Sequence, residues 1–274
     1  FELLGKIKPT HVMNLPQNPE QKSSLKLWYQ ELVRVKEKLE ETFQVEITDE
    51  ALRAAIRVTN EENRALKDLF DLNRARPALI TGTDMITVSY QTEFATDSIQ
   101  GIELIDRLVA EIRDMAREGY HVGEKDSPRI LLTGTPVSEG TDKIVRLVEA
   151  AGGVVAAMEN CGGYKTVELV IDENDPRDPL LLLAEKYLKI PCSVMSPNTD
   201  RLVLLERMLE DFQIDGVIDL TWQACHTYNV EAYAVGQLVK SKGLPYLQIE
   251  TDYSNSDMES LRVRIEAMLE MVSG

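Results

Sequence analysis

Three cysteines, Cys161, Cys192 and Cys225, are the residues of this chain best suited to chemistry. Each lies in a stretch of polar residues or glycines that we expect to form a turn, and none lies inside an apolar run. Thiolates in turns before helices can bind metals or act as nucleophiles. Because iron–sulfur clusters are held mainly by cysteine thiolates, we predict that the three thiolates converge on a metal centre of iron and sulfide.

The same residues permit other interpretations. Three cysteines without a C-x-x-C pair form a weak motif, and free cysteines are often simply buried in the core. A Cys₃His zinc site could include His226, although adjacent residues seldom ligate one ion comfortably. Cys225 and His226 could also act as a nucleophile and its base, but sequence neighbours usually point apart. These alternatives stay open on spacing alone.

The elements that must position the cysteines alternate between strands and helices after residue 125. Apolar strands are expected at residues 129–133, 153–159, 216–221 and 245–250. Helices are expected at residues 141–151, 179–188, 199–212, 228–242 and 257–271. This alternation predicts an α/β fold in residues 126–274, a doubly wound four-stranded parallel sheet with helices on both faces. The strand exits would then share one edge, where ligands bind.

A glycine-rich turn follows the first expected strand. Residues 134–140 precede a helix, so their N–H groups could cradle a phosphate. They lack the G-x-G-x-x-G spacing and the Lys-Ser/Thr pair of a P-loop. We therefore interpret this segment as an ordinary turn before a helix.

Residues 17–125 form a mostly helical region by their periodicity. Helices are expected over residues 23–43, capped by Ser23 or Ser24, and over 48–72 and 101–118, the last capped by Asp97 or Ser98. The segment 78–95 has mixed propensity, and we favour a helix because Thr83 and Asp84 offer a start. The first residues, 1–16, are interpreted as the trailing piece of an N-terminal α/β domain that is missing from this sequence, with a strand at Thr10–Pro16.

Composition narrows the class of protein. The chain has 274 residues, of which 43% are hydrophobic and 28% charged, as in a soluble globular protein. A formal charge of −16 argues against a nucleic-acid or anionic-membrane partner. We see no signal peptide and no apolar run of membrane-spanning length. Three cysteines are then expected to be reduced, in a cytoplasmic protein.

Five segments of the sequence, taken together, resemble those of a known superfamily. The segments are residues 158–165, 187–198, 215–219, 222–231 and 247–254. In this order they resemble the 2-hydroxyacyl-CoA dehydratase D-component and benzoyl-CoA reductase superfamily, most closely its double-cubane cluster branch. The resemblance spans nearly the whole chain.

The resemblance implies two α/β domains with an iron–sulfur cluster between them and a helical region alongside. Cluster cysteines of the second domain would map onto Cys161, Cys192 and Cys225, and those of the first domain would lie upstream of Phe1. This chain alone is then expected to hold little or no iron. Electrons would come from a separate ATP-hydrolysing activator with its own cluster. Proton delivery would fall to His226, Lys165 or Glu159.

The predicted function is therefore that of the C-terminal part of an iron–sulfur reductase. It would receive ATP-gated electrons and reduce a small molecule at a double-cubane cluster, as a dimer. The alternative is a subunit of a 2-hydroxyacyl-CoA dehydratase, in which a four-iron cluster drives a radical dehydration. A third hypothesis is a non-catalytic α/β scaffold without metal.

Overall fold

The computed structural model describes residues 3–273, and the chain divides into two compact units. The first unit comprises Phe1–Asn60 and Val170–Asn198, and the second comprises Glu61–Leu169 and Thr199–Gly274. The unit boundary falls within one helix, at Asn60. The predicted domain boundaries at residues 16 and 125 stay predictions.

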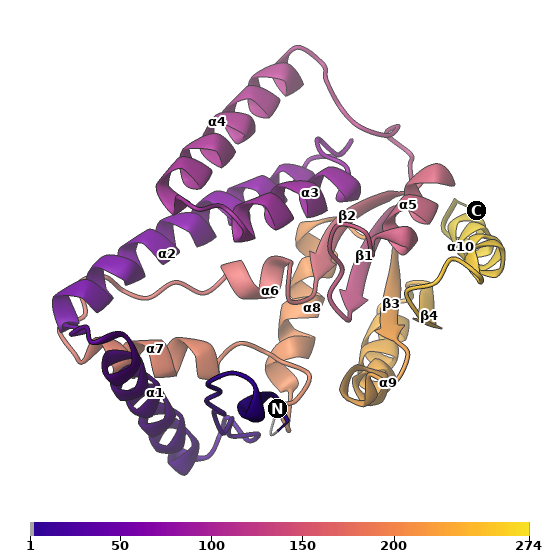
Figure 1. Cartoon of the computed structure of the whole chain (residues 1–274). Coiled ribbons are helices and arrows are strands. Elements are labelled where there is room, and N and C mark those ends of the chain that lie inside the picture. Colours follow the sequence, from indigo (N-terminus) through magenta and orange to yellow (C-terminus); the bar gives the residue numbers. More distant parts are fainter. Residues whose placement is uncertain (1–2, 274) are drawn as a thin grey trace. The chain divides into compact units, whose positions relative to one another are not determined.

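The second unit is built around a parallel sheet that has four strands within the described residues, in the order β2-β1-β3-β4 (Figure 1). The strands are β1 (Arg129–Gly134), β2 (Val154–Glu159), β3 (Gly216–Trp222) and β4 (Tyr246–Thr251). Every residue of β1, β2 and β3 is buried, which explains why these strands are apolar without a period-two alternation. The predicted α/β fold with a four-stranded parallel sheet is confirmed.

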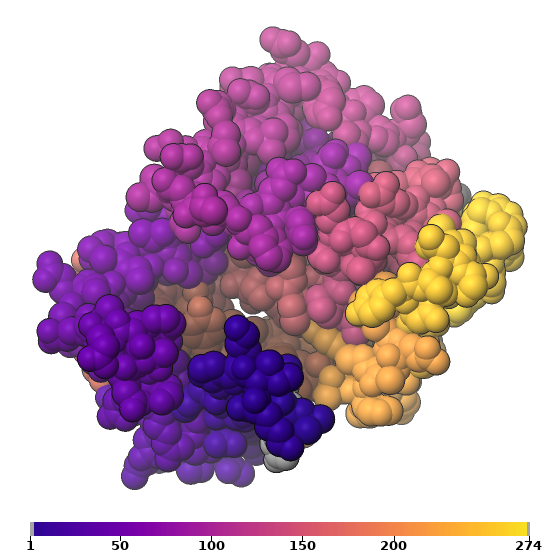
Figure 2. Space-filling view, viewed as in Figure 1, coloured from indigo at the N-terminus to yellow at the C-terminus, as the bar shows by residue number. Residues whose placement is uncertain are grey.

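Helices cover both faces of this sheet. On one face α5 (Lys143–Ala150) packs against α10 (Met258–Ser273), and the two are neighbours at the surface in the space-filling view (Figure 2). A Cβ atom added to Gly216 in β3 would come within 2.7 Å of Met268 in α10, so this face is tightly packed. On the other face α8 (Thr199–Asp211) packs against α9 (His226–Ser241).

A β-bulge sets which side chains of β2 reach each face. Ile130 pairs with Val155, but the next residue, Leu131, pairs with Ala157. The extra residue reverses the alternation of β2 beyond this point. Glu159 consequently pairs with Thr133 of β1 and shares a sheet face with it.

Helices α3 (Gly82–Glu93) and α4 (Ser98–Arg117) complete the second unit with the short α6 (Tyr164–Val167). The helix predicted in 78–95 is confirmed, but its predicted start is wrong. Thr81 caps α3 by accepting a hydrogen bond from the Asp84 N–H at 3.0 Å. The Asp97 side chain caps α4, as predicted.

The first unit contains α1 (Lys22–Phe43) packed against α7 (Pro179–Leu188), and it includes the first half of α2 (Asp49–Asp71). Ser23 and Ser24 lie inside α1, so their predicted capping role is wrong; the cap position is Gln21. Short 3₁₀ helices occur at Leu4–Lys6 and, in the second unit, at Leu72–Arg74.

The strand predicted at Thr10–Pro16 is not formed. These residues have no regular secondary structure, because no neighbouring strand takes up their backbone hydrogen bonds. Among the described helices, none is long and apolar enough to cross a membrane.

Candidate functional site

Two of the three predicted thiol ligands lie at the carboxyl edge of the sheet. Cys161 is exposed just beyond β2, and Cys225 is half-buried at the N-cap of α9, just beyond β3. Both strands run parallel to β1, so their exits share this edge. The Cys161 Sγ atom lies 3.7 Å from the hydroxyl of Tyr228, in the first turn of α9. Cys161 therefore lies against the helix that Cys225 caps.

The turn from β3 into α9 is tight. The Cys225 N–H donates to the Trp222 carbonyl at 2.9 Å, and Ala224 takes the left-handed conformation with φ 70°. Helix α9 begins at His226, two residues before the predicted start at Tyr228. His226 is thus the first helical residue, and its side chain is exposed.

Cys192 belongs to the first unit, where it lies half-buried in a turn. Its carbonyl accepts hydrogen bonds from the Met195 N–H and the Asn198 side chain, both at 3.0 Å. All three cysteines are free thiols. Within the described residues no group of three or more His, Cys, Asp or Glu is placed to hold a metal. The convergence of the three thiols stays a prediction.

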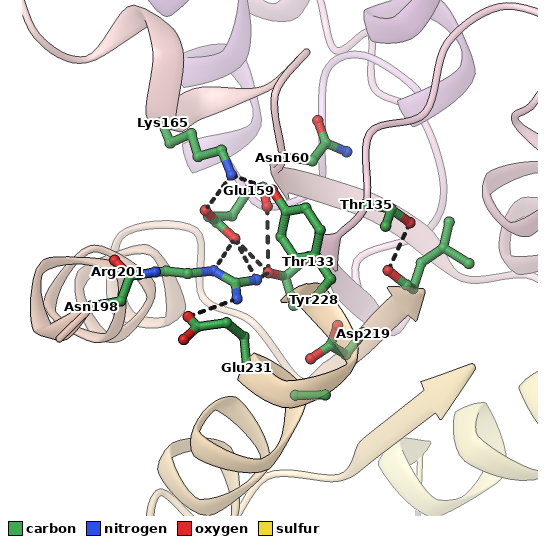
Figure 3. Close-up of polar contacts among 12 residues, drawn as sticks. Thr133, Thr135, Glu159, Asn160, Lys165, Asn198, Arg201, Asp219, Tyr228 and Glu231 are labelled. Atoms are coloured by element: carbon green, nitrogen blue, oxygen red, sulfur yellow. Dashed lines mark hydrogen bonds and ion pairs between the residues drawn. The ribbon is translucent and has the colours of Figure 1, made fainter. Parts of the chain in front are cut away.

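A network of buried charges lies on the α8–α9 face of the sheet (Figure 3). Glu159 and Arg201 are 0% exposed and Lys165 is 1% exposed. The Glu159 Oε2 atom accepts from Arg201 Nε at 3.2 Å and from the Thr133 hydroxyl at 2.5 Å. Lys165 Nζ lies 3.4 Å from Glu159 Oε1. Glu159 thus joins two buried cations contributed by different helices.

Two more carboxylates surround Arg201. Its Nη1 atom lies 3.3 Å from Glu231 Oε2, and Asp219 of β3 accepts from the Tyr246 hydroxyl at 2.9 Å. Burial raises the pKa of Asp219 to about 6, against the opposing charge of Arg201. Burial also lowers the pKa of Arg201, but Glu159 and Asp219 outweigh this effect and leave that pKa above its usual range. Arg201 therefore stays cationic.

Tyr228 connects this network to the thiol at the sheet edge. Lys165 Nζ donates to the Tyr228 oxygen at 2.7 Å, so the phenolic hydrogen is available to Cys161. Lys165 Nζ and Arg201 Cζ also lie 5.2 and 5.0 Å from the centre of the Tyr228 ring. Burial, followed by the charges of Cys161 and Glu159, raises the pKa of Tyr228. The phenol therefore remains a hydrogen-bond donor at neutral pH.

Comparison with known proteins shows which family the chain belongs to. The family model for the 2-hydroxyglutaryl-CoA dehydratase D-component matches residues 1–272. The chain belongs to this D-component family. The predicted family resemblance is confirmed.

Its relatives include named enzyme subunits. YjiM of Escherichia coli (strain K12), which bears the provisional name of a dehydratase subunit, is 40% identical over 273 residues, 99% of this chain and 70% of YjiM. The beta subunit of (R)-phenyllactyl-CoA dehydratase of Clostridium sporogenes is 25% identical over 264 residues, 94% of this chain and 67% of that protein. One of the benzoyl-CoA reductase subunits of Thauera aromatica is 21% identical over 269 residues, 96% of this chain and 67% of that protein.

The predicted proton carriers of this D-component chain lie in different surroundings. Glu159 and Lys165 are buried and form an ion pair with each other. Lys165 also donates a hydrogen bond to Tyr228, which lies at the sheet edge. His226 is exposed and lies next to Cys225. The structure therefore brings Glu159 and Lys165 together and leaves His226 at the surface. Their roles in proton transfer stay predictions.

Sequence reasoning missed Arg201, which lies at the centre of the charged network. The sequence did indicate that Arg201 is buried. Arg201 has helical spacing with three apolar residues on the buried face of α8, namely Leu204, Leu205 and Met208. An arginine in phase with core residues indicates a buried ion pair. Asp219 carried a similar signal, since it interrupts the apolar run of β3.

Proposed function

We propose that this chain is part of an iron–sulfur enzyme whose cluster is held by Cys161, Cys192 and Cys225. The enzyme receives low-potential electrons from an ATP-hydrolysing activator and reduces a small molecule at a double-cubane cluster. One observation carries the proposal: Cys161 lies against the helix that Cys225 caps, with a buried phenol beside its sulfur. Membership of the D-component family supports the same assignment.

The side chains at this edge suit such a cofactor. Both thiols are free and occupy a turn and a helix N-cap, positions in which thiolates serve as metal ligands. Tyr228 can donate a hydrogen bond to the Cys161 sulfur, an outer contact of the kind that tunes a metal site. When bound, an iron–sulfur cluster supplies single electrons at a potential set by such contacts.

The surrounding residues hold protons and orient one another. The Tyr228 hydroxyl, whose oxygen lies 3.7 Å from the Cys161 sulfur, can donate a hydrogen bond to that sulfur, and Lys165 donates to the Tyr228 oxygen. Glu159 fixes Lys165 through their ion pair. His226 is exposed beside Cys225, and the role proposed for it is proton delivery.

A second candidate is a subunit of a 2-hydroxyacyl-CoA dehydratase with a four-iron cluster. The support for it is the 40% identity to YjiM, provisionally named a dehydratase subunit. The phenyllactyl-CoA dehydratase subunit shares 25% identity, and two benzoyl-CoA reductase subunits share 21% and 25%. The two candidates differ in electron consumption. A reduction uses two electrons per product, whereas dehydration leaves the oxidation state of the substrate unchanged overall. Electrons consumed per product, measured with the activator and ATP, separate them.

Anaerobic iron and acid-labile sulfide analysis of the full-length protein tests the proposal. We expect stoichiometric iron in the wild type and a loss of most iron in each of Cys161→Ala, Cys192→Ala and Cys225→Ala. Ser256→Ala, at the exposed β4 exit, is the matched control and should keep its iron. Iron-free wild-type protein, or full occupancy in all three cysteine variants, would contradict the proposal.

A further inference from the structure

A small cavity in the first unit lies between α2 and α7. Its volume is about 70 Å³. Leu52 and Ile56 line it from α2, and Leu183 lines it from α7. Thr59 and Lys186 add a hydroxyl and an ammonium group to this apolar lining. The cavity therefore combines a cation with a hydrocarbon wall.

Lys186 is a buried lysine without a counter-ion. The residue is 7% exposed, whereas Lys189, just past the end of α7, is exposed. Among the described residues, Lys186 Nζ forms no ion pair and no hydrogen bond. Burial lowers the pKa of Lys186, and within this part of the chain no carboxylate opposes that effect. An ammonium group removed from water without a partner costs free energy, so an anion that reaches it would be favoured.

The ammonium group of Lys186 lies where a ligand can reach it. Nζ is 5.4 Å from the centre of the Tyr187 ring, and Tyr187 lines the same cavity. Nζ is also not one of the unpartnered polar atoms that are closed to water. The cation is therefore accessible beside the cavity.

Thr59 supplies a second donor. Its hydroxyl makes no hydrogen bond to the described residues and is not closed to water. By contrast, Thr87 and Thr92 in α3 each donate to the carbonyl four residues earlier. The neighbouring Asn60 amide is occupied, because it both donates to and accepts from the Ile171 backbone, at 2.8 and 3.0 Å. Thr59 and Lys186 thus leave two donors for one ligand.

The lining and volume restrict what that ligand is. The described lining contains no aspartate or glutamate, so a carboxylate would meet no like charge there. Leu52, Ile56 and Leu183 suit a short apolar group. A volume of 70 Å³ equals the liquid volume of about two water molecules, which limits the ligand to a molecule of the size of acetate.

We propose that this cavity binds a small carboxylate of the size of formate or acetate. One carboxylate oxygen accepts from Lys186 Nζ, and the other accepts from the Thr59 hydroxyl. The remaining part of the ligand contacts Leu52 and Ile56. This inference goes beyond the proposed function, because binding at this site requires no cluster.

Saturation-transfer NMR of acetate with the full-length protein tests the proposal. We expect a signal that saturates with acetate concentration. Acetamide, an uncharged molecule of the same shape, should bind at least about tenfold more weakly, because it cannot pair with the ammonium group. Lys186→Met should weaken acetate binding at least about tenfold for the same reason. Thr59→Val keeps the shape of the side chain and should weaken binding about threefold or more.

Lys189→Met makes the same change at an exposed lysine and should leave the affinity for acetate unchanged. Lys186→Met should keep or raise the wild-type free energy of unfolding, because its ammonium group has no partner to lose. A clear loss of stability in Lys186→Met would show that a partner was present, and would overturn the proposal. No saturable binding to the wild type, equal binding of acetamide, or unchanged affinity in either site variant would also overturn it. None of these results depends on the iron analysis.

Discussion

The two faces of the parallel sheet are both covered by helices, but the side chains buried on them differ in chemistry. Beneath α5 and α10 the side chains are mainly apolar, with Ile144, Val148 and Ile265 all 0% exposed, and the buried Lys143 pairs with Asp257 at the start of the two helices. Beneath α8 and α9 the strands present Glu159 and Asp219, equally buried, to Arg201. Buried apolar contacts stabilise a fold without further conditions, whereas buried charges stabilise it only when every partner is in place.

We call the side of the sheet beneath α8 and α9 the charged face and the side beneath α5 and α10 the apolar face. The difference between them indicates that the charged face has a role besides stabilising the fold. Replacing a buried ion pair by apolar residues is often neutral or stabilising, so a fold gains little from it alone. The network instead holds Lys165, and through it Tyr228, next to the sulfur of Cys161. The charged face supports the candidate site, and the apolar face supports the sheet.

The largest expected effect comes from removing the central cation. Arg201→Met leaves Glu159 and Asp219 buried without their common partner. We expect it to lower the free energy of unfolding by about 3–5 kcal/mol, measured by urea denaturation at pH 7. Arg207→Met is the matched control on the same helix, because Arg207 pairs with Glu168 at the surface. The control should cost no more than about 1 kcal/mol. Equal effects of the two substitutions would contradict the account.

Asp219 should make the charged face sensitive to pH. Its folded pKa of about 6 lies above the ordinary 3.8, so the folded protein retains this proton where the unfolded chain has released it. Its contribution to stability is therefore full below about pH 4 and is lost as the pH rises through 6. The difference between the two pKa values of Asp219, 3.8 and about 6, corresponds to roughly 3 kcal/mol of unfolding free energy.

Asp219→Asn removes this titration. Its unfolding free energy relative to the wild type should therefore rise between pH 4 and pH 7.5, as measured by urea denaturation at both values. A difference that does not change with pH would show that Asp219 titrates normally.

Tyr228→Phe tests the connection to the sheet edge. The substitution removes the hydroxyl that accepts from Lys165, while the ring remains beside Lys165 and Arg201. We expect a loss of about 1.5 kcal/mol in unfolding free energy, since a hydrogen bond from a charged donor is lost. No loss would mean that Lys165 finds another partner and that Tyr228 does not anchor it.

The smallest effect is expected on the apolar face. Ile265→Val removes one methylene from a residue that is 0% exposed, which should cost about 1 kcal/mol. The cost should be the same at pH 4 and pH 7.5, because no titratable group loses a partner. A clear dependence on pH would break the proposed division between the two faces.

Much of the fold could be predicted from local patterns. The apolar runs of β1 to β4 and the amphipathic repeats of the helices were visible, because burial and periodicity are written directly in the sequence. Residues 10–16 were predicted wrongly, since β propensity does not by itself supply a partner strand.

The candidate site was only partly predictable. Cys161 and Cys225 could be placed on one edge because parallel strands end on the same side. The pairing of Arg201 with Glu159 could not be predicted from the sequence, because it depends on a bulge in β2 that sets which face of the sheet Glu159 reaches. Tertiary packing of three separate segments decides that contact.

The central claim is that thiolates at this sheet edge hold iron. Iron-edge X-ray absorption on the anaerobically purified, full-length protein tests it most directly. The account predicts that the iron is surrounded by sulfur and that this signal is lost in Cys161→Ala and Cys225→Ala. Iron bound only by oxygen and nitrogen, or zinc in place of iron on the same thiols, would contradict it.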